Sequence, residues 1–469
     1  MKKYMSHMMM LAIAVGISTL FVITTFANAK PPGADDDWNY WTNAPNMFAN
    51  VTGNVGIGTS SPLAKFQVTG GAVLFSGTTG GTPTSGSGTR CMWIPSKAAF
   101  RVGAVSGNQW NNANIGLYSI AFGYNTKASG LYSTALGYQT TANGTRSTAM
   151  GNHSTASGVD STTMGYFTRA SGVHSTAMGD QATAFGNFST ALGYLTTASG
   201  VTSTAMGYFT VASGPDSTAM GHITIANGVH ATAIGDGTTA SGDASTAMGL
   251  TSTAIGDTST AMGFLSTASG VTSTAMGFAT IASGVDSTAM GHITVANGTH
   301  ATSMGDGTIA SGAYSTAMGL LSTANGVTST AMGYNTIASG IDSTAMGHQT
   351  TANGIFATAM GLWTTASGNY STTLGQTITV NGLNSVGIGL DNHNPNWIVN
   401  ANHVMSVMGG KVGIGTTNPA RALDIKDVMR LEPRSTFPSS ASDGDLCVKG
   451  TSSNYHIYCY LNGDWRQLD

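Results

Sequence analysis

The chain has 469 residues, of which 64 are glycine and only 8% are charged, and its formal net charge is −3. Globular domains carry about 25% charged residues, so this composition excludes an ordinary core beneath a charged surface for most of the chain. Binding to phosphates needs clustered Lys and Arg, but residues 115–389 hold only Lys127, Arg146 and Arg169 against nine aspartates. This balance argues against nucleic acid as a partner.

The N-terminus has the pattern of a Sec signal peptide. Lys2 and Lys3 precede an apolar run over residues 8–26, and small residues follow at positions 27–29. We predict a signal peptide over residues 1–29 with cleavage after Ala29, and therefore an exported protein at the cell surface or secreted. An uncleaved signal anchor is the alternative. Residues 30–53 form a polar segment, and no membrane-spanning segment is expected in the mature chain.

A short motif recurs on both sides of the central region. Residues 55–62 read Val-Gly-Ile-Gly-Thr-Ser-Ser-Pro and are followed by an apolar triplet at 66–68, and residues 412–425 repeat this arrangement. Each copy predicts two short strands around a turn that ends at Pro. Because an open solenoid end exposes strand edges, we interpret residues 54–114 and 390–430 as cap or neck modules. Independent binding modules are the alternative, and Arg90 to Arg101 is expected to be an ordered junction.

The central region is a repeat in which a glycine falls every 14 residues from Gly123 to Gly389. A typical unit, from Ser203 to Gly214, reads Ser-Thr-Ala-Met-Gly-x-x-Thr-x-Ala-Ser-Gly. The residue before the first Gly is apolar in every copy, and the residue two positions earlier is Thr in every full copy. The apolar column includes Met150, Met164, Met178, Met206, Met220, Met248, Met262, Met276, Met290, Met304, Met318, Met332, Met346 and Met360. The Thr column includes Thr148, Thr204, Thr218, Thr274, Thr288 and Thr330.

This repeat excludes several architectures. Gly costs a helix interior about 1 kcal/mol, so two Gly per unit exclude a coiled coil despite the spacing of seven. Collagen needs Gly at every third residue, and calcium-binding nonapeptide solenoids need a regular Asp. The alternation of apolar and polar residues predicts strands instead. We therefore predict an all-β parallel solenoid of about 19 coils, on the order of 90 Å long at roughly 4.8 Å per coil.

The unit resembles the head repeat of trimeric autotransporter adhesins (YadA-like), usually written Ser-Val-Ala-Ile-Gly-x-x-Ala-x-Ala-x-Gly. The likeness covers residues 115–389, with Thr replacing the usual Val and Met replacing Ile. It implies a left-handed parallel β-roll and a homotrimer in which the apolar column is buried between subunits. Members of the family normally end in a coiled-coil stalk and a membrane anchor. Neither pattern is visible before Asp469, so association with an outer membrane stays open.

Residues 431–469 alternate polar and apolar residues and predict a small β-meander, similar to terminal domains of fibre proteins. Cys447 and Cys459 fall on what would be adjacent strands, and an exported protein can oxidise them. We predict a disulfide between them. Cys91 is then left single, either buried or paired between chains.

No catalytic arrangement is evident, and we expect no enzyme, cofactor or metal. Histidines share two columns, which raises the possibility of metal sites. The blocks around Gly221 and Gly291 are nearly identical, however, so duplication explains most of this recurrence. The histidines are His174, His230 and His300 in one column and His222, His292 and His348 in the other.

Two classes of function follow from the repeat. The first is an adhesive fibre head that binds a host, matrix or glycan surface through many weak contacts. The second is an ice- or crystal-binding solenoid, which requires an exposed Thr column. A phage tail-fibre-like receptor-binding protein explains the flanking motifs but not the signal peptide. The direction in which Thr204 and Thr218 point discriminates the first two.

Overall fold

The computed structural model describes residues 38–39, 48–49, 54–451 and 454–468. The predicted signal peptide and its cleavage site after Ala29 lie outside the described residues. The chain forms two compact units, Met1–Gly77 and Thr78–Asp469, so the predicted module over residues 54–114 spans the division between them. In the first unit, β1 (Trp38–Asn39) pairs antiparallel with β2 (Phe48–Ala49), and β3 (Val55–Ile57) pairs parallel with β4 (Phe66–Val68).

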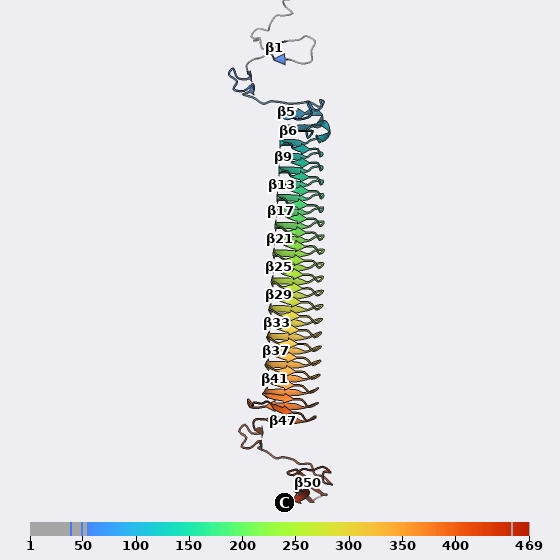
Figure 1. The fold of residues 1–469 in the computed structure, drawn as a ribbon, viewed down its shortest axis with the longest axis vertical. Coiled ribbons are helices and arrows are strands. Elements are labelled where there is room, and N and C mark those ends of the chain that lie inside the picture. Colours follow the sequence, from blue (N-terminus) through green and yellow to red (C-terminus); the bar gives the residue numbers. More distant parts are fainter. Residues whose placement is uncertain (1–37, 40–47, 50–53, 452–453, 469) are drawn as a thin grey trace, which may run out of the picture. The chain divides into compact units, whose positions relative to one another are not determined.

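In the second unit, coils of 14 residues stack into two parallel sheets (Figure 1). Each coil gives one longer strand to the first sheet and one short strand to the second. The longer strands are β7 (Ile120–Tyr124), β9 (Thr134–Tyr138), β11 (Thr148–Asn152), β13 (Thr162–Tyr166), β15 (Thr176–Asp180), β17 (Thr190–Tyr194), β19 (Thr204–Tyr208), β21 (Thr218–His222), β23 (Thr232–Asp236), β25 (Thr246–Leu250), β27 (Thr260–Phe264), β29 (Thr274–Phe278), β31 (Thr288–His292), β33 (Thr302–Asp306), β35 (Thr316–Leu320), β37 (Thr330–Tyr334), β39 (Thr344–His348), β41 (Thr358–Leu362), β43 (Thr372–Gln376) and β45 (Val386–Gly389). The short strands are β8 (Lys127–Ala128), β10 (Thr141–Ala142), β12 (Thr155–Ala156), β14 (Arg169–Ala170), β16 (Thr183–Ala184), β18 (Thr197–Ala198), β20 (Val211–Ala212), β22 (Ile225–Ala226), β24 (Thr239–Ala240), β26 (Thr253–Ala254), β28 (Thr267–Ala268), β30 (Ile281–Ala282), β32 (Val295–Ala296), β34 (Ile309–Ala310), β36 (Thr323–Ala324), β38 (Ile337–Ala338), β40 (Thr351–Ala352), β42 (Thr365–Ala366) and β44 (Ile378–Val380).

The interior of the coils is filled by small side chains. In the coil that begins at Ser203, the side chains of Ser203, Ala205, Thr210 and Ala212 have no exposed surface. The alanines at these positions form one cluster over residues 170–366 and a second over residues 121–156. Because side chains alternate along a strand, the residues between them point away from this core. Each coil therefore buries little apolar surface by itself, and its order depends on its neighbours.

Two glycine columns and two left-handed corners fix the length of a coil. A β-carbon on Gly214 would lie 1.9 Å from the carbonyl oxygen of Gly228 in the next coil, so only glycine fits. The two corners turn at left-handed residues, Phe209 with a φ of 53° and Asp216 with a φ of 54°. Their N–H groups donate to carbonyl oxygens of the previous coil, over 2.9 Å and 2.8 Å respectively. An inserted residue would break these bonds, which explains why the 14-residue period does not change between Gly123 and Gly389.

The N-terminal end of the stack is closed by a hairpin. β5 (Gly88–Ile94) and β6 (Ala99–Val105) are antiparallel, and β6 pairs parallel with β7. Two 3₁₀ turns, η1 (Pro95–Lys97) and η2 (Asn112–Asn114), flank β6. The guanidinium of Arg101 is fully buried and donates to the carbonyl oxygens of Ser119 (2.8 Å) and Ala128 (2.9 Å). Burial lowers the pKa of Arg101 to about 10, and its donors satisfy carbonyls at the open end of the first coils.

The stack continues past Gly389 by one enlarged coil. β46 (Trp397–Val399) and β47 (Met405–Met408) extend the two sheets, and Val386 pairs with Met405, 19 residues later. The extra residues lie in the loop over residues 390–396. Beyond it, β48 (Val412–Ile414) and β49 (Leu423–Ile425) form a parallel pair. β50 (Leu446–Thr451), β51 (Asn454–Leu461) and β52 (Asp464–Gln467) form an antiparallel sheet.

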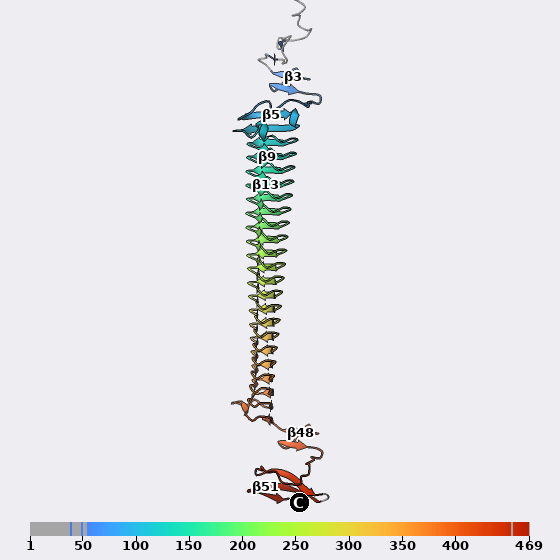
Figure 2. The same cartoon turned by 90° about the vertical axis from the view of Figure 1, so that its right-hand side faces the viewer.

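The predicted fold class is confirmed. From β7 to β45 every longer strand pairs in parallel with the strand 14 residues away, and equal positions lie side by side, as Met206 does with Met220. A view turned by a quarter shows the same single column of coils (Figure 2). Apart from η1 and η2, the described residues contain no helix.

Candidate functional site

The outward face of the longer strands carries the two predicted columns. Thr204 and Met206 lie on either side of the buried Ala205, so both side chains point out of the roll and are half-buried. The register places each on the same residue type in the next coil over most of the stack. We call these the Thr row and the Met row. The Thr row contains Thr148, Thr204, Thr218, Thr274, Thr288 and Thr330. The Met row contains Met150, Met164, Met178, Met206, Met220, Met248, Met262, Met276, Met290, Met304, Met318, Met332, Met346 and Met360.

The position of these rows answers the question left open by the sequence. In one chain the Thr and Met rows share one face, and that face lies outside the roll rather than in its core. The core positions that sequence reasoning missed are the alanines and serines between them, such as Ala205 and Ser203. The sequence pattern could have revealed them. Residues two apart on a strand share a face, so Ser, Ala and Gly lie on one face of the strand while Thr and Met lie on the other.

The first corner of each coil, at positions such as Tyr208 and Phe209, carries a column of exposed rings. The ring centroids of Tyr194 and Tyr208 lie 5.1 Å apart, and those of Tyr208 and His222 lie 5.0 Å apart. The column then continues to Asp236, whose Oδ1 lies 2.7 Å from Nδ1 of His222. Stacking at the coil spacing therefore holds large side chains in order on the surface.

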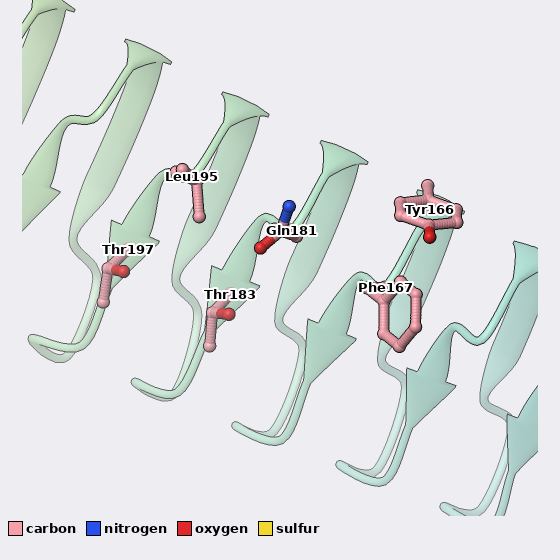
Figure 3. Close-up of a pocket in the computed structure, with 6 residues that line it drawn as sticks. All are labelled: Tyr166, Phe167, Gln181, Thr183, Leu195 and Thr197. Atoms are coloured by element: carbon pink, nitrogen blue, oxygen red, sulfur yellow. The ribbon is translucent and has the colours of Figure 1, made fainter.

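A groove of about 550 Å³ runs beside this corner. Phe167, Gln181 and Leu195 occupy the same position in three consecutive coils, above Thr183 and Thr197 on the short strands (Figure 3). Tyr166 closes one end, and its ring packs edge-on against Phe167. The groove thus combines aromatic surface with hydroxyl and amide groups, which are the kinds of group that contact polar ligands.

The second corner, at positions such as Pro215 and Asp216, carries the other histidine column. His230 lies 3.7 Å from Asp216, and His300 lies 3.4 Å from Asp286. Sequence reasoning noted that these histidines recur several coils apart, but it missed that each has an Asp in the adjoining coil. The described residues contain no group of three or more His, Cys, Asp or Glu side chains that could hold a metal ion.

Only one strong ion pair connects coils at the second corner among the described residues. Arg146 donates two hydrogen bonds of 2.5 Å to the carboxylate of Asp160. These bonds hold the pKa of the Asp160 carboxyl below its ordinary value, and they raise the pKa of Arg146. Both groups are solvent-accessible, so the pair adds little stability.

The structure contradicts the predicted disulfide between Cys447 and Cys459. Both thiols are free. In the hairpin of β50 and β51, Cys459 lies opposite Leu446 while Cys447 lies opposite Tyr458. Since successive side chains on a strand point to opposite faces, this register directs the two sulfur atoms to opposite sides of the sheet. Cys91, which was left single, is exposed on β5.

The fold and its surface define a class of protein: a parallel β-solenoid that presents repeated columns of side chains. The model of the YadA head domain repeat (2 copies) matches this chain in ten segments, which together cover more than half of its length. The chain belongs to the YadA head family, a family of structural adhesins, and the resemblance seen in the sequence is confirmed. The matched segments are 115–140, 142–168, 170–196, 198–222, 226–252, 254–280, 282–308, 310–336, 338–362 and 352–376.

No curated protein matches the chain significantly. Within the part of the chain that the structure describes, no helix has the length and apolar character needed to cross a membrane.

Proposed function

We propose that this protein is an exported, homotrimeric fibre head that attaches to a surface through many equivalent weak contacts and performs no catalysis. The observation that carries the proposal is the face formed by the Thr and Met rows. It runs along the stack and is half exposed in a single chain. Within this face the Met row is a strip of apolar side chains, and an exposed apolar strip marks an interaction surface.

Association of three chains would supply what one chain lacks. The core of a coil consists of Ala, Ser, Thr and Gly, so the hydrophobic stabilisation within a chain is small. Burying Met206 and its equivalents between subunits would add apolar contact in every coil. Met is flexible and fills irregular gaps, and Thr hydroxyls can pair across such a seam. The trimer is the assembly that the family implies.

The corners of the coils would then form the attachment surface. In many coils they present exposed rings such as those of Tyr208 and Phe209, with few charges. Many weak contacts on one rigid body add through avidity without any single strong site. Such a surface suits a host, matrix or glycan ligand better than nucleic acid, because the repeats contain few Lys and Arg residues.

Solution mass combined with small-angle scattering on residues 30–469 tests the assembly. We expect an elongated particle with three times the mass of the chain. A compact monomer would contradict the proposal. Attachment is tested by coating beads with this chain or with a version that lacks residues 203–272, which removes five whole coils. If contacts are multivalent, the shortened trimer should bind cells or matrix more weakly while keeping its oligomeric state.

The Thr row also supports a second candidate, an ice- or crystal-binding solenoid. Thr190, Thr204 and Thr218 lie in register at the spacing of the coils on an outward face. This candidate uses the same face as the trimer, so the two exclude each other. Thermal hysteresis by a monomeric chain would favour the second candidate, and a trimer that covers the Thr row would eliminate it.

A further inference from the structure

The enlarged coil at the C-terminal end of the stack forms one side of a second cavity at the first corner. Its volume is about 430 Å³, and it is lined by Trp363, Thr377, Asn392, His393, Asn394 and Asn396. Trp363 and Thr377 occupy the first corner of two successive regular coils. The other four residues come from the seven-residue loop over 390–396, which stands beside that corner.

Hydrogen bonds hold the wall of this cavity in place. The hydroxyl of Thr377 donates to the carbonyl oxygen of Asp391 (2.9 Å) and accepts from the N–H of His393 (2.8 Å). The amide of Asn396 donates to the carbonyl oxygen of Trp363 over 3.3 Å. The His393 ring stacks on Trp397 with centroids 3.9 Å apart. The loop is thus organised before any ligand arrives, which reduces the entropy lost on binding.

Two kinds of side chain in the cavity, an aromatic ring and two amides, are available to contact a ligand. Trp363 is 41% exposed, and its indole N–H donates a hydrogen bond to Oε1 of Gln349 in the previous coil, which fixes the ring where it lines the cavity. The side-chain amides of Asn392 and Asn394 are exposed and make no hydrogen bond to the described part of the chain. An amide offers both donors and acceptors, so it pairs with hydroxyl groups in either sense.

The charges around the cavity narrow the ligand class. No Lys or Arg lines the cavity, so it offers no fixed positive charge to a phosphate or a carboxylate. The nearest carboxylate, Asp391, accepts a hydrogen bond from the Trp397 indole at 3.1 Å. A neutral ligand with one apolar face and a rim of hydroxyls matches an aromatic platform beside free amides. A pyranose ring has this form, because its C–H groups cover one face and its hydroxyls lie around the edge.

We propose that the cavity between Trp363 and the loop over residues 390–396 binds a neutral saccharide. One sugar ring stacks on the Trp363 indole, and its hydroxyls pair with the amides of Asn392 and Asn394. This inference rests on the proposed attachment function, because it names the class of ligand to which the protein would attach. Three such sites on a trimer would give trivalent binding to a glycan-coated surface.

The test titrates the chain over residues 30–469 with cellotriose, maltotriose and triacetylchitotriose, with glucose 6-phosphate as the anionic comparison, followed by saturation-transfer NMR. At least one neutral probe should bind with a Kd of about 1 mM or tighter. The Trp363→Ala variant should weaken it by roughly tenfold or more, and Asn394→Ala by about threefold. Because Asn394 is an exposed loop residue, this second variant keeps the fold. Val428→Ala changes an exposed residue beyond the stack and outside the cavity, and it should leave the affinity unchanged.

Absence of binding by all three neutral probes would overturn the inference. It would also be overturned by unchanged affinity in Trp363→Ala, or by tighter binding of the phosphorylated sugar. Failure of the attachment function is distinguishable, since the chain would then bind the soluble probe without retaining beads on any surface. Retained bead attachment without probe binding would contradict the saccharide site alone.

Discussion

A β-carbon on Gly207 would lie 2.0 Å from the carbonyl oxygen of Gly221 in the next coil. Gly207 also has a φ of 124°, in a region that other residues rarely adopt. Both facts hold for the equivalent glycine in coil after coil. The glycine column therefore sets how closely the coils stack, and it gives the first prediction.

Gly207→Ala should destabilise its coil by more than about 2 kcal/mol, because it adds a left-handed penalty to a clash with backbone. Hydrogen exchange should quicken in peptides that cover residues 200–230, and the melting temperature should fall. Gly81→Ala is the control, since nothing lies within 4 Å of its β-carbon. Equal protection in the two variants would contradict the stacking argument.

Ala205→Leu should disrupt the interior of the roll. Ala205 has no exposed surface and is surrounded by other small residues, so extra methyl groups cost about 1–3 kcal/mol or more. Met206→Leu changes the adjoining residue on the outward face and should be nearly neutral. Chemical denaturation monitored by circular dichroism compares the two. If Met206→Leu lowered the free energy of unfolding more than Ala205→Leu, the assignment of Ala205 to the core would be contradicted.

Met206→Lys combined with Met220→Lys should dissociate the proposed trimer. The two residues are neighbours in register, so three subunits would bring six uncompensated charges into one seam. Light scattering should show the mass fall to that of one chain at micromolar concentration. Tyr208→Lys, on the corner of the same coil, should remain trimeric. An unchanged mass for the double variant would show that this face is not the interface.

The Arg146–Asp160 pair should give a small dependence of stability on pH. Hydrogen bonds from Arg146 lower the folded-state pKa of Asp160. The stability that the pair contributes is therefore fully present above the pKa of Asp in the unfolded chain, about 3.9. It is lost as the pH falls through the lower pKa of Asp160 in the folded chain. Arg146→Met should have a slightly lower melting temperature than the natural chain near pH 6, with no difference near about pH 2. Arg169→Met is the control, because Arg169 lies over the Phe185 ring and not beside a carboxylate. A difference that grows toward low pH would contradict the assigned sign.

Three free thiols should be found in the purified chain without reductant. Cys91 is exposed and should react quickly with a thiol reagent at about pH 8. Cys447 and Cys459 are buried, and burial raises the pKa of the Cys447 thiol, so both should react slowly until the chain is unfolded. Mass spectrometry after labelling counts the modified residues. A mass two units low, with only Cys91 labelled after unfolding, would restore the predicted disulfide.

The repeat allowed the solenoid to be predicted because glycine at Gly207 and Gly214 and alternation around Ala205 are local properties of the sequence. The face of the Thr row could not be fixed in advance, since Thr204 and Ala205 are both small enough for the interior. The His222–Asp236 contact depends on residues 14 apart and was within reach once the coil length was known. The cavity at Trp363 could not be predicted from the sequence, because it depends on the conformation of the irregular loop over residues 390–396. The disulfide prediction was wrong because Cys459 pairs with Leu446, one residue before Cys447, so the two thiols lie on opposite faces of the sheet.

The backbone bond from the N–H of Phe209 to the carbonyl of Tyr194 recurs in nearly every turn of the stack. Each turn therefore meets its neighbours through the same main-chain contacts, whatever its surface side chains are. Recombination between near-identical gene segments, such as those around Gly221 and Gly291, would insert or remove complete turns. The hairpin of β5 and β6 at one end of the stack and the enlarged coil at the other end would stay intact. The number of turns can thus change in whole steps while every remaining turn keeps the same main-chain contacts with its neighbours.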